Sequence, residues 1–98
     1  MSESDARPLK LLLTRHAEKD LLHLAEEFRH RIKADILRLA RGEIPYAQLK
    51  KLRSFKPPTS QMTSGRFRIL YRRESELLLI LRVVSKPDQR DLFRRRLA

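Results

Sequence analysis

The 98-residue sequence contains no cysteine and no tryptophan, and only two glycines. The absence of cysteine excludes disulfide bonds, thiolate metal sites and cysteine nucleophiles. Two isolated glycines cannot form the glycine-rich loop that cradles phosphates in nucleotide-binding enzymes. The longest apolar run, residues 77–81, is far too short to cross a bilayer. The N-terminus is polar and acidic, unlike a secretory signal, so we expect a cytoplasmic protein without a membrane partner.

Positive charge is what the sequence has in excess. Its 23 Lys and Arg residues against 12 Asp and Glu give a formal net charge of +11, far more than solubility requires. Such a charge on a small domain creates a field that attracts polyanions and accelerates their encounter. We therefore expect the partner to be nucleic acid, a nucleoprotein or an acidic protein.

The apolar pattern predicts a loose tail over residues 1–7 and a single domain over residues 8–98. Apolar residues recur every three or four positions over residues 17–40, which predicts a helix or a helix pair, with Gly42 as its C-terminal stop. A short helix is expected near the C-terminus, over residues 89–97. The predicted strands are residues 8–14, 61–63, 67–71 and 77–84. This order predicts an α+β domain: a small antiparallel sheet of about four strands, with the N-terminal helices on one face and the other face open.

Strand alternation divides the side chains of the predicted hairpin between the two faces of the sheet. Phe67, Ile69 and Tyr71 share one face and are expected to pack under the helices. The opposite face is expected to be basic, which suits the binding of phosphates. Its predicted members are Arg66, Arg68 and Arg72, joined by Arg82 from the next strand and followed by Lys86 and Arg90.

Few other residues have the pattern of a catalytic site. His16, His23 and His30 are seven residues apart, which would group them on one helix face, but no flanking ligands accompany them. We expect neither a metal nor a cofactor. No Ser or Thr has a base motif beside it, which argues against an ordinary metabolic enzyme. A ribonuclease remains compatible, because the 2′-hydroxyl of RNA can act as nucleophile while Arg and Lys stabilise the phosphate.

Several motifs resemble the RelE/ParE superfamily, the small toxins of type II toxin–antitoxin systems. The stretch 65–71, Gly-Arg-Phe-Arg-Ile-Leu-Tyr, is similar to a family strand in which glycine is followed by an aromatic residue, an arginine and apolar residues. Residues 89–94 are similar to the family's C-terminal motif. Residues 17–21, 29–32 and 49–53 match further motifs in the same order. The resemblance covers the chain from about residue 11 to the C-terminus and implies helices packed on one side of a small antiparallel sheet.

The resemblance also implies roles for individual residues. Arg68 matches the arginine that contacts the scissile phosphate in RelE-like toxins, and Lys86 matches a basic position after the last strand. Arg90 would assist, close to the position of the family's final arginine. Phe93 stands where many members have a tyrosine, and a phenyl ring can stack on a base but cannot transfer a proton. Residues expected to bind phosphate are Arg66, Arg72, Arg82 and Arg94, whereas Thr63 replaces a basic residue.

Three functions are compatible with this resemblance. A RelE-like toxin would bind the ribosome and cleave mRNA as a metal-independent endoribonuclease with weakened proton-transfer equipment. A ParE-like toxin would inhibit DNA gyrase and would need no catalytic tyrosine. A degenerate toxin fold would bind partners without catalysis. Either toxin would be held inactive by a cognate antitoxin, which we expect to be acidic.

Overall fold

The computed structural model describes residues 9–53, 55–87 and 89. That part of the chain folds into a mixed five-stranded sheet, two α-helices and a short 3-10 helix. The elements follow one another as β1 (Lys10–Leu13), α1 (Arg15–Leu22), α2 (Glu26–Ala40), η2 (Tyr46–Gln48), β2 (Leu49–Leu52), β3 (Thr59–Ser64), β4 (Phe67–Glu74) and β5 (Leu77–Ser85). The α+β class predicted from the sequence is confirmed.

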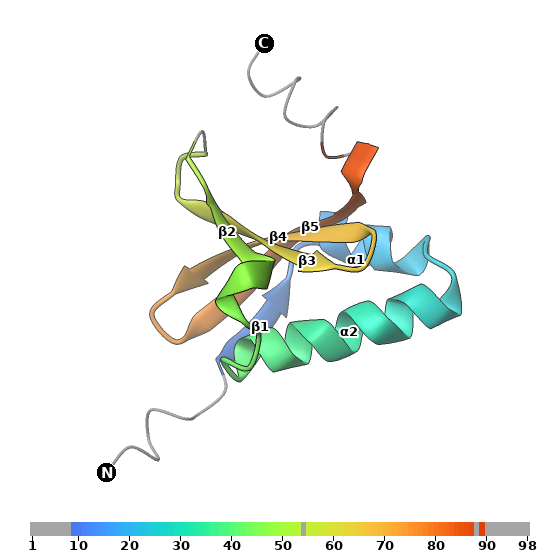
Figure 1. Ribbon diagram of the computed structural model, residues 1–98, viewed down its shortest axis with the longest axis horizontal. Coiled ribbons are helices and arrows are strands. Elements are labelled where there is room, and N and C mark those ends of the chain that lie inside the picture. The colour runs from blue at the N-terminus through green and yellow to red at the C-terminus, as the bar shows by residue number, and fades with distance from the viewer. Residues whose placement is uncertain (1–8, 54, 88, 90–98) are drawn as a thin grey trace.

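The strands lie in the order β1-β5-β4-β3-β2 (Figure 1). The three pairs β2–β3, β3–β4 and β4–β5 are antiparallel, but β1 runs parallel to β5. The predicted all-antiparallel sheet was therefore wrong at this pair. The physical reason is that β1 is followed by two helices and not by a hairpin turn, so no local connection sets its direction.

The sheet also has one strand more than the four predicted. β2 lies within a segment whose apolar residues show no alternation, and it pairs with β3 so that Leu49 faces Met62 and Leu52 faces Thr59. Two lysines at its centre hid the strand from the sequence pattern, because charged residues are common on edge strands. β2 therefore extends the sheet beyond β3.

The apolar stripe over residues 17–40 belongs to two helices. Thr14 caps the first: its Oγ1 accepts a hydrogen bond from the backbone N–H of Ala17 at 3.1 Å and donates one to the Leu81 carbonyl at 2.7 Å. α1 ends at Leu22, and α2 begins after a short break. Gly42, with φ +73°, terminates α2 as predicted.

This break changes the expected grouping of the histidines. His16 lies on α1, His23 is the C-cap of that helix, and His30 lies on α2. The three side chains therefore do not share one helix face, contrary to the expectation from their spacing. His30 faces Glu26 on its own helix, and His23 contacts the Lys19 carbonyl.

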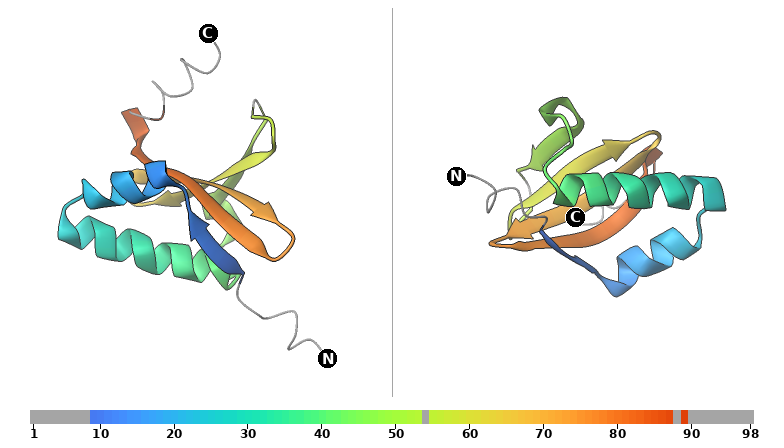
Figure 2. Two further views of the ribbon diagram at one scale, coloured as in Figure 1. Left: turned by 180° about the vertical axis from the view of Figure 1, so that it is seen from behind. Right: turned by 90° about the horizontal axis from the view of Figure 1, so that it is seen from below.

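Both helices pack on one face of the sheet (Figure 2). Ala17 and Leu21 from α1 and Ile32 and Ile36 from α2 meet the inward residues of the strands. The face opposite the helices was predicted to be open, but it carries a second apolar cluster. This smaller cluster contains Leu52, Phe55 and Leu70, with Leu81 packed against it.

Some predictions concern residues beyond the described ranges. The tail over residues 1–7 lies outside them, as do all residues of the expected C-terminal helix except Gln89. Among the described residues, no helix is long and apolar enough to cross a membrane.

Candidate nucleic-acid interface

Two arginines of β4 project from the face opposite the helices. Ile69 and Tyr71 belong to the core under the helices, so alternation places Arg68, Leu70 and Arg72 on the other side. Leu70 is buried in the smaller apolar cluster, which places it between the two arginines. Four residues of strand separate Arg68 from Arg72 by about 13 Å. The face is therefore a basic surface with an apolar centre, as expected for these two residues.

Arg68 has no carboxylate beside it among the described residues. Its cross-strand neighbours are Thr63 on β3 and Val84 on β5. Within the described ranges, its guanidinium donates to the backbone carbonyls of Phe67, at 3.2 Å, and Gly65, at 3.5 Å. Within residues 9–53, 55–87 and 89, no acidic side chain forms an ion pair with it. Its charge is therefore available to an anionic ligand.

The chain that follows β5 returns to this same face. Gln89 is buried and donates a hydrogen bond from its amide to the Oε1 of Gln61 on β3. β4 lies between β5 and β3, so Gln89 lies across β4 from the end of β5, and the described residues of this segment lie at the end of the sheet that carries Arg68. Lys86, which lies in that segment, is exposed. The structure therefore brings Lys86 to the same end of the sheet as Arg68.

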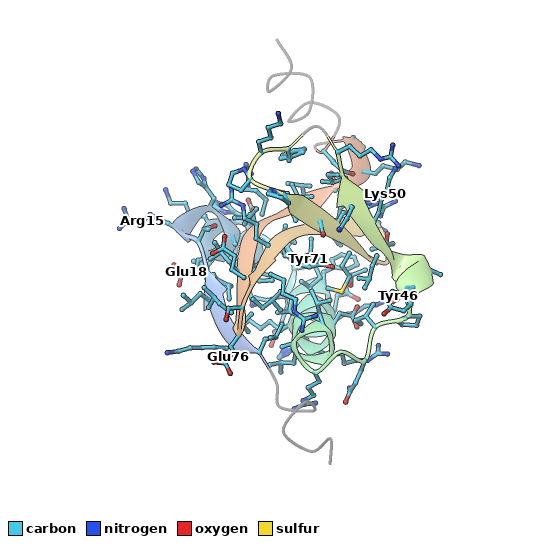
Figure 3. All side chains as sticks on the ribbon, turned by 90° about the vertical axis from the view of Figure 1, so that its left-hand side faces the viewer. Arg15, Glu18, Tyr46, Lys50, Tyr71 and Glu76 are labelled. Atoms are coloured by element: carbon cyan, nitrogen blue, oxygen red, sulfur yellow. The ribbon has the colours of Figure 1, made fainter. Side chains whose placement is uncertain are left out.

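Lys50 is a further cation that the sequence analysis did not assign to the site. It lies on β2 directly opposite Gln61, so it projects from the same face (Figure 3). The position of Lys50 depends on the pairing of β2 with β3, and β2 was not predicted from the sequence. Lys50 could therefore not be assigned to this face from the sequence. Lys50 and Arg68 border Gln61 and Thr63 from two sides.

Arg66 is not on this face, contrary to the prediction. It occupies the two-residue turn between β3 and β4, and its guanidinium lies 5.1 Å from the centre of the Phe28 ring on α2. The Phe28 ring packs edge-on against Phe67, at 5.4 Å between centroids. A turn residue is released from strand alternation, so Arg66 stacks on the helix side as a cation–π pair.

Arg82 is also placed differently from the prediction. Its Nε donates to Asp20 Oδ2 at 2.9 Å and its Nη2 donates to Oδ1 at 3.2 Å, so the side chain forms a two-pronged ion pair with α1. The Asp20 carboxylate explains this placement, because it also accepts the Val83 backbone N–H and so lies against β5 beside Arg82. The strand register alone pairs Arg82 with Leu70 and leaves Leu81 as an extra residue in β5. Arg82 therefore stabilises the contact between α1 and β5 and does not extend the basic surface.

Arg72 keeps its predicted face but has an unusual environment. Its Nε is buried and has no hydrogen-bond partner among the described residues. Across the strands it faces Leu79 on β5. Arg72 is therefore more enclosed than Arg68. The positions of Arg90, Phe93 and Arg94 lie outside the described residues.

The chemistry that this face can perform is charge stabilisation. Arg68 can donate two hydrogen bonds to one phosphate, and Lys86 adds a second positive charge. The carboxylate of β4 that alternation assigns to this face, Glu74, is six residues from Arg68, about 20 Å along the strand. All three histidines lie on the helical segment. The described part of the face therefore offers positive charge to a phosphate, and no general base lies beside Arg68 among the described residues.

Neither a protein-family model nor a curated protein sequence matches this chain. Solved structures do match it. A chain of the archaeal RelE–RelB complex from Pyrococcus horikoshii superposes with a TM-score of 0.68 and 15% identity, over 82% of this chain and 97% of that one. A chain of the RelB–RelE antitoxin–toxin complex from Methanococcus jannaschii gives a TM-score of 0.67 and 21% identity, over 84% and 98%.

A third structure is more similar in sequence. A chain of the toxin–antitoxin complex RelBE2 from Mycobacterium tuberculosis gives a TM-score of 0.58 and 29% identity, over 82% of this chain and all of that one. The chain thus has the RelE-like toxin fold, as the resemblance implied. In this structure Arg68 projects from the face opposite the helices, and Lys86 lies at the same end of the sheet.

Proposed function

We propose that the protein is the toxin of a type II toxin–antitoxin pair and acts as a RelE-like, ribosome-dependent mRNA endoribonuclease. The observation that carries the proposal is the Arg68 guanidinium, which lies on a strand of a RelE-like fold with backbone carbonyls as its only described partners. Rigid strands hold a cation more accurately than loops do, and accuracy decides how well it stabilises a developing charge.

In the proposed reaction the RNA supplies its own nucleophile. The 2′-oxygen forms a bond to the adjacent phosphorus while the bond from phosphorus to the 5′-oxygen breaks, leaving a cyclic phosphate and a 5′-hydroxyl. Arg68 and Lys86 stabilise the additional negative charge on the phosphate oxygens in the transition state. The proton of the 2′-hydroxyl passes to water or to an RNA group, since no side chain described beside Arg68 is a histidine or a carboxylate. The departing 5′-oxygen takes its proton from water. A missing general base typically lowers a rate by about 10²- to 10⁴-fold, so the cleavage is expected to be slow.

The test is to map mRNA 3′ ends in a reconstituted translation reaction, with and without ribosomes. Wild-type protein should cut within codons only when ribosomes are present. Arg68→Ala should reduce the cleavage rate by about 10²-fold or more, the typical effect of removing one charge-stabilising donor. Arg41→Ala removes the same charge from an exposed helix end and should cut normally. Full cleavage by a folded Arg68→Ala protein would refute the assignment.

Gyrase inhibition is the second candidate. It is favoured because the described residues place no proton-transfer group beside Arg68, and a protein that only binds gyrase needs none. Phe93 in place of the usual tyrosine points the same way. If ribosomes programmed with mRNA are not cut, a DNA-cleavage assay with purified gyrase should show accumulation of broken DNA. If gyrase is also unaffected, a toxin fold that binds without catalysis is the remaining explanation.

The proposed toxin requires an antitoxin, which we expect to be acidic. A partner that binds only the folded toxin raises its stability in proportion to RT ln(1 + [L]/Kd), about 2.7 kcal/mol at one hundred times Kd. The acidic product of the adjacent gene should therefore raise the melting temperature of this protein. An unchanged melting temperature would contradict the pairing.

A further inference from the structure

The helix side of the sheet is covered only as far as α2 extends. Leu49, Met62, Ile69 and Val83 form a row across four strands and belong to the core under the helices. The next row contains Lys51, Ser60, Tyr71 and Ile80. α2 ends at Ala40, where Gly42 turns the chain away from the helix axis, so the polar members of this second row lie beside a hollow.

Two adjoining hollows form one groove at this place. One has a volume of about 460 Å³ and the other about 520 Å³, and they share Tyr46, Leu49, Tyr71 and Arg73 as lining residues. Figure 3 labels Tyr71 on the sheet, and Tyr46 and Lys50 at the edge formed by η2 and β2. We name this the Tyr46 groove and define it by Tyr46, Lys51, Ser60, Tyr71 and Arg73.

Tyr46 is the most unusual residue of the groove. Its side chain is 92% exposed, although η2, on which it lies, is fixed by neighbours that pack on the core. Ile44 is buried before it, Leu49 is half-buried after it, and the Gln48 N–H donates to the Pro45 carbonyl at 2.9 Å. A fixed backbone with an uncovered ring offers a flat aromatic surface for stacking.

The charge of the groove is positive. Lys51 and Arg73 line it from the helix side, and Lys50, which projects from the opposite face of edge strand β2, also borders one hollow. The one carboxylate among the described lining residues is Glu43. No ion pair joins these three cations to an acidic side chain within the described ranges. The combination of an aromatic ring with cations on both sides is the pattern by which proteins bind single-stranded nucleic acid.

Tyr71 adds a hydrogen-bond donor to the floor. Burial raises the pKa of its hydroxyl, while a hydrogen bond with Ser60 and the positive charge of Arg73 partly oppose that rise. The phenol therefore keeps its proton at neutral pH and can donate to a phosphate or sugar oxygen. Ser60 faces it directly from β3.

We propose that the Tyr46 groove binds a short segment of single-stranded RNA, with one base stacked on Tyr46 and neighbouring phosphates held by Lys51 and Arg73. The groove is on the helix side of the sheet, whereas Arg68 is on the face opposite the helices, so this contact is separate from the proposed cleavage site. The inference depends on the proposed function only in choosing RNA as the polyanion. An acidic peptide could pair with the cations, but its carboxylates would not stack on the exposed ring of Tyr46 as a nucleic-acid base does.

Binding is to be measured by fluorescence anisotropy with the isolated protein and a labelled ten-nucleotide 2′-O-methyl RNA, which cannot be cleaved through the 2′-oxygen. Tyr46→Ala should weaken binding by about 5- to 150-fold, the range for loss of one stacked base. Tyr46→Phe keeps the ring and should bind as the wild type. Arg73→Gln should reduce the slope of log K against log salt by about 0.7, the value for one phosphate contact on a single strand. Lys33→Gln, the same charge change on an exposed position of α2, should leave the slope unchanged.

The outcomes separate this inference from the proposed cleavage. Arg68→Ala should lose cleavage but keep oligonucleotide binding. Wild-type protein that binds RNA through Tyr46 but cleaves no mRNA would still support RNA binding in the Tyr46 groove. Equal effects of Arg73→Gln and Lys33→Gln, with no effect of Tyr46→Ala, would show diffuse charge attraction and overturn the inference. Tyr46→Ala that weakens an acidic antitoxin but not RNA would overturn it in favour of a protein partner.

Discussion

Asp20 holds α1 onto β5, and its replacement by alanine should destabilise the protein more than any change on the basic surface. Its carboxylate accepts three hydrogen bonds: two from the Arg82 guanidinium, at 2.9 and 3.2 Å, and one from the Val83 backbone N–H at 2.8 Å. The Asp20 side chain is 17% exposed and that of Arg82 is 33% exposed, so solvent screens the pair only in part. Asp20→Ala removes the acceptor that Asp20 provides for the Val83 N–H and for the Arg82 guanidinium.

The expected loss follows from these contacts. Breaking a buried ion pair by removing one partner costs about 3–5 kcal/mol, and partial exposure lowers the expectation here to about 2–3 kcal/mol. Arg82→Ala should cost less, about 1–2 kcal/mol, because Asp20 still accepts the Val83 N–H. In a domain of this size, 1 kcal/mol shifts the melting temperature by about 4–8 °C, so Asp20→Ala should lower it by roughly 10–20 °C.

The measurement is urea denaturation followed by circular dichroism, with the free energy of unfolding compared at constant m-value. The double variant Asp20→Ala/Arg82→Ala should be more stable than the sum of the two single losses predicts, because the shared interaction is removed only once. Ordinary surface substitutions change the free energy of unfolding by about 0.5 kcal/mol or less. A change no larger than this for Asp20→Ala would refute the reasoning. A stable Arg82→Ala protein with lost RNA binding would restore Arg82 to the basic surface.

Two further predictions concern local contacts. Thr14→Ala should lower stability by about 1–2 kcal/mol, because it removes the cap on Ala17 and the bond to Leu81, whereas Thr14→Ser should retain most of it in the same denaturation assay. Burial raises the pKa of Tyr71 in the folded protein, so the unfolded chain loses the phenol proton at a lower pH. The free energy of unfolding should therefore fall as the pH rises from about 10, the ordinary tyrosine value, to the raised pKa of the folded state. Tyr71→Phe should remove this part of the alkaline loss, and identical pH profiles would contradict the assignment.

The parts of the structure that could be predicted are those that depend on local periodicity. The stripe of α2, its stop at Gly42 and the hairpin of β4 and β5 were predicted because helix and strand spacing is visible in neighbouring residues. Alternation also placed Ile69 and Tyr71 in the core and Arg68 on the other face. Within β4 nothing interrupts the alternation, so the prediction held along the whole strand.

The errors have a common physical origin, since each depends on partners distant in the chain. The carboxylate of Asp20 on α1, 62 residues away, decides the position of Arg82. The Phe28 ring on α2 decides that of Arg66. Lys50 joined the basic surface only because β2 pairs with β3. None of these contacts leaves a signal in the residues that flank the misplaced side chain.

The sequence by itself determined the class of this protein. A charge of +11 without cysteine, an apolar stripe at helical spacing over residues 17–40 and a basic strand next to glycine were enough to predict an α+β domain for an anionic partner. The tertiary structure alone decided which cations are available to that partner. Arg68 remains without an acidic partner among the described residues, while the ion pair with Asp20 neutralises Arg82. Composition records how many charges a chain carries, but only folding brings each one to its partner or leaves it exposed to a ligand.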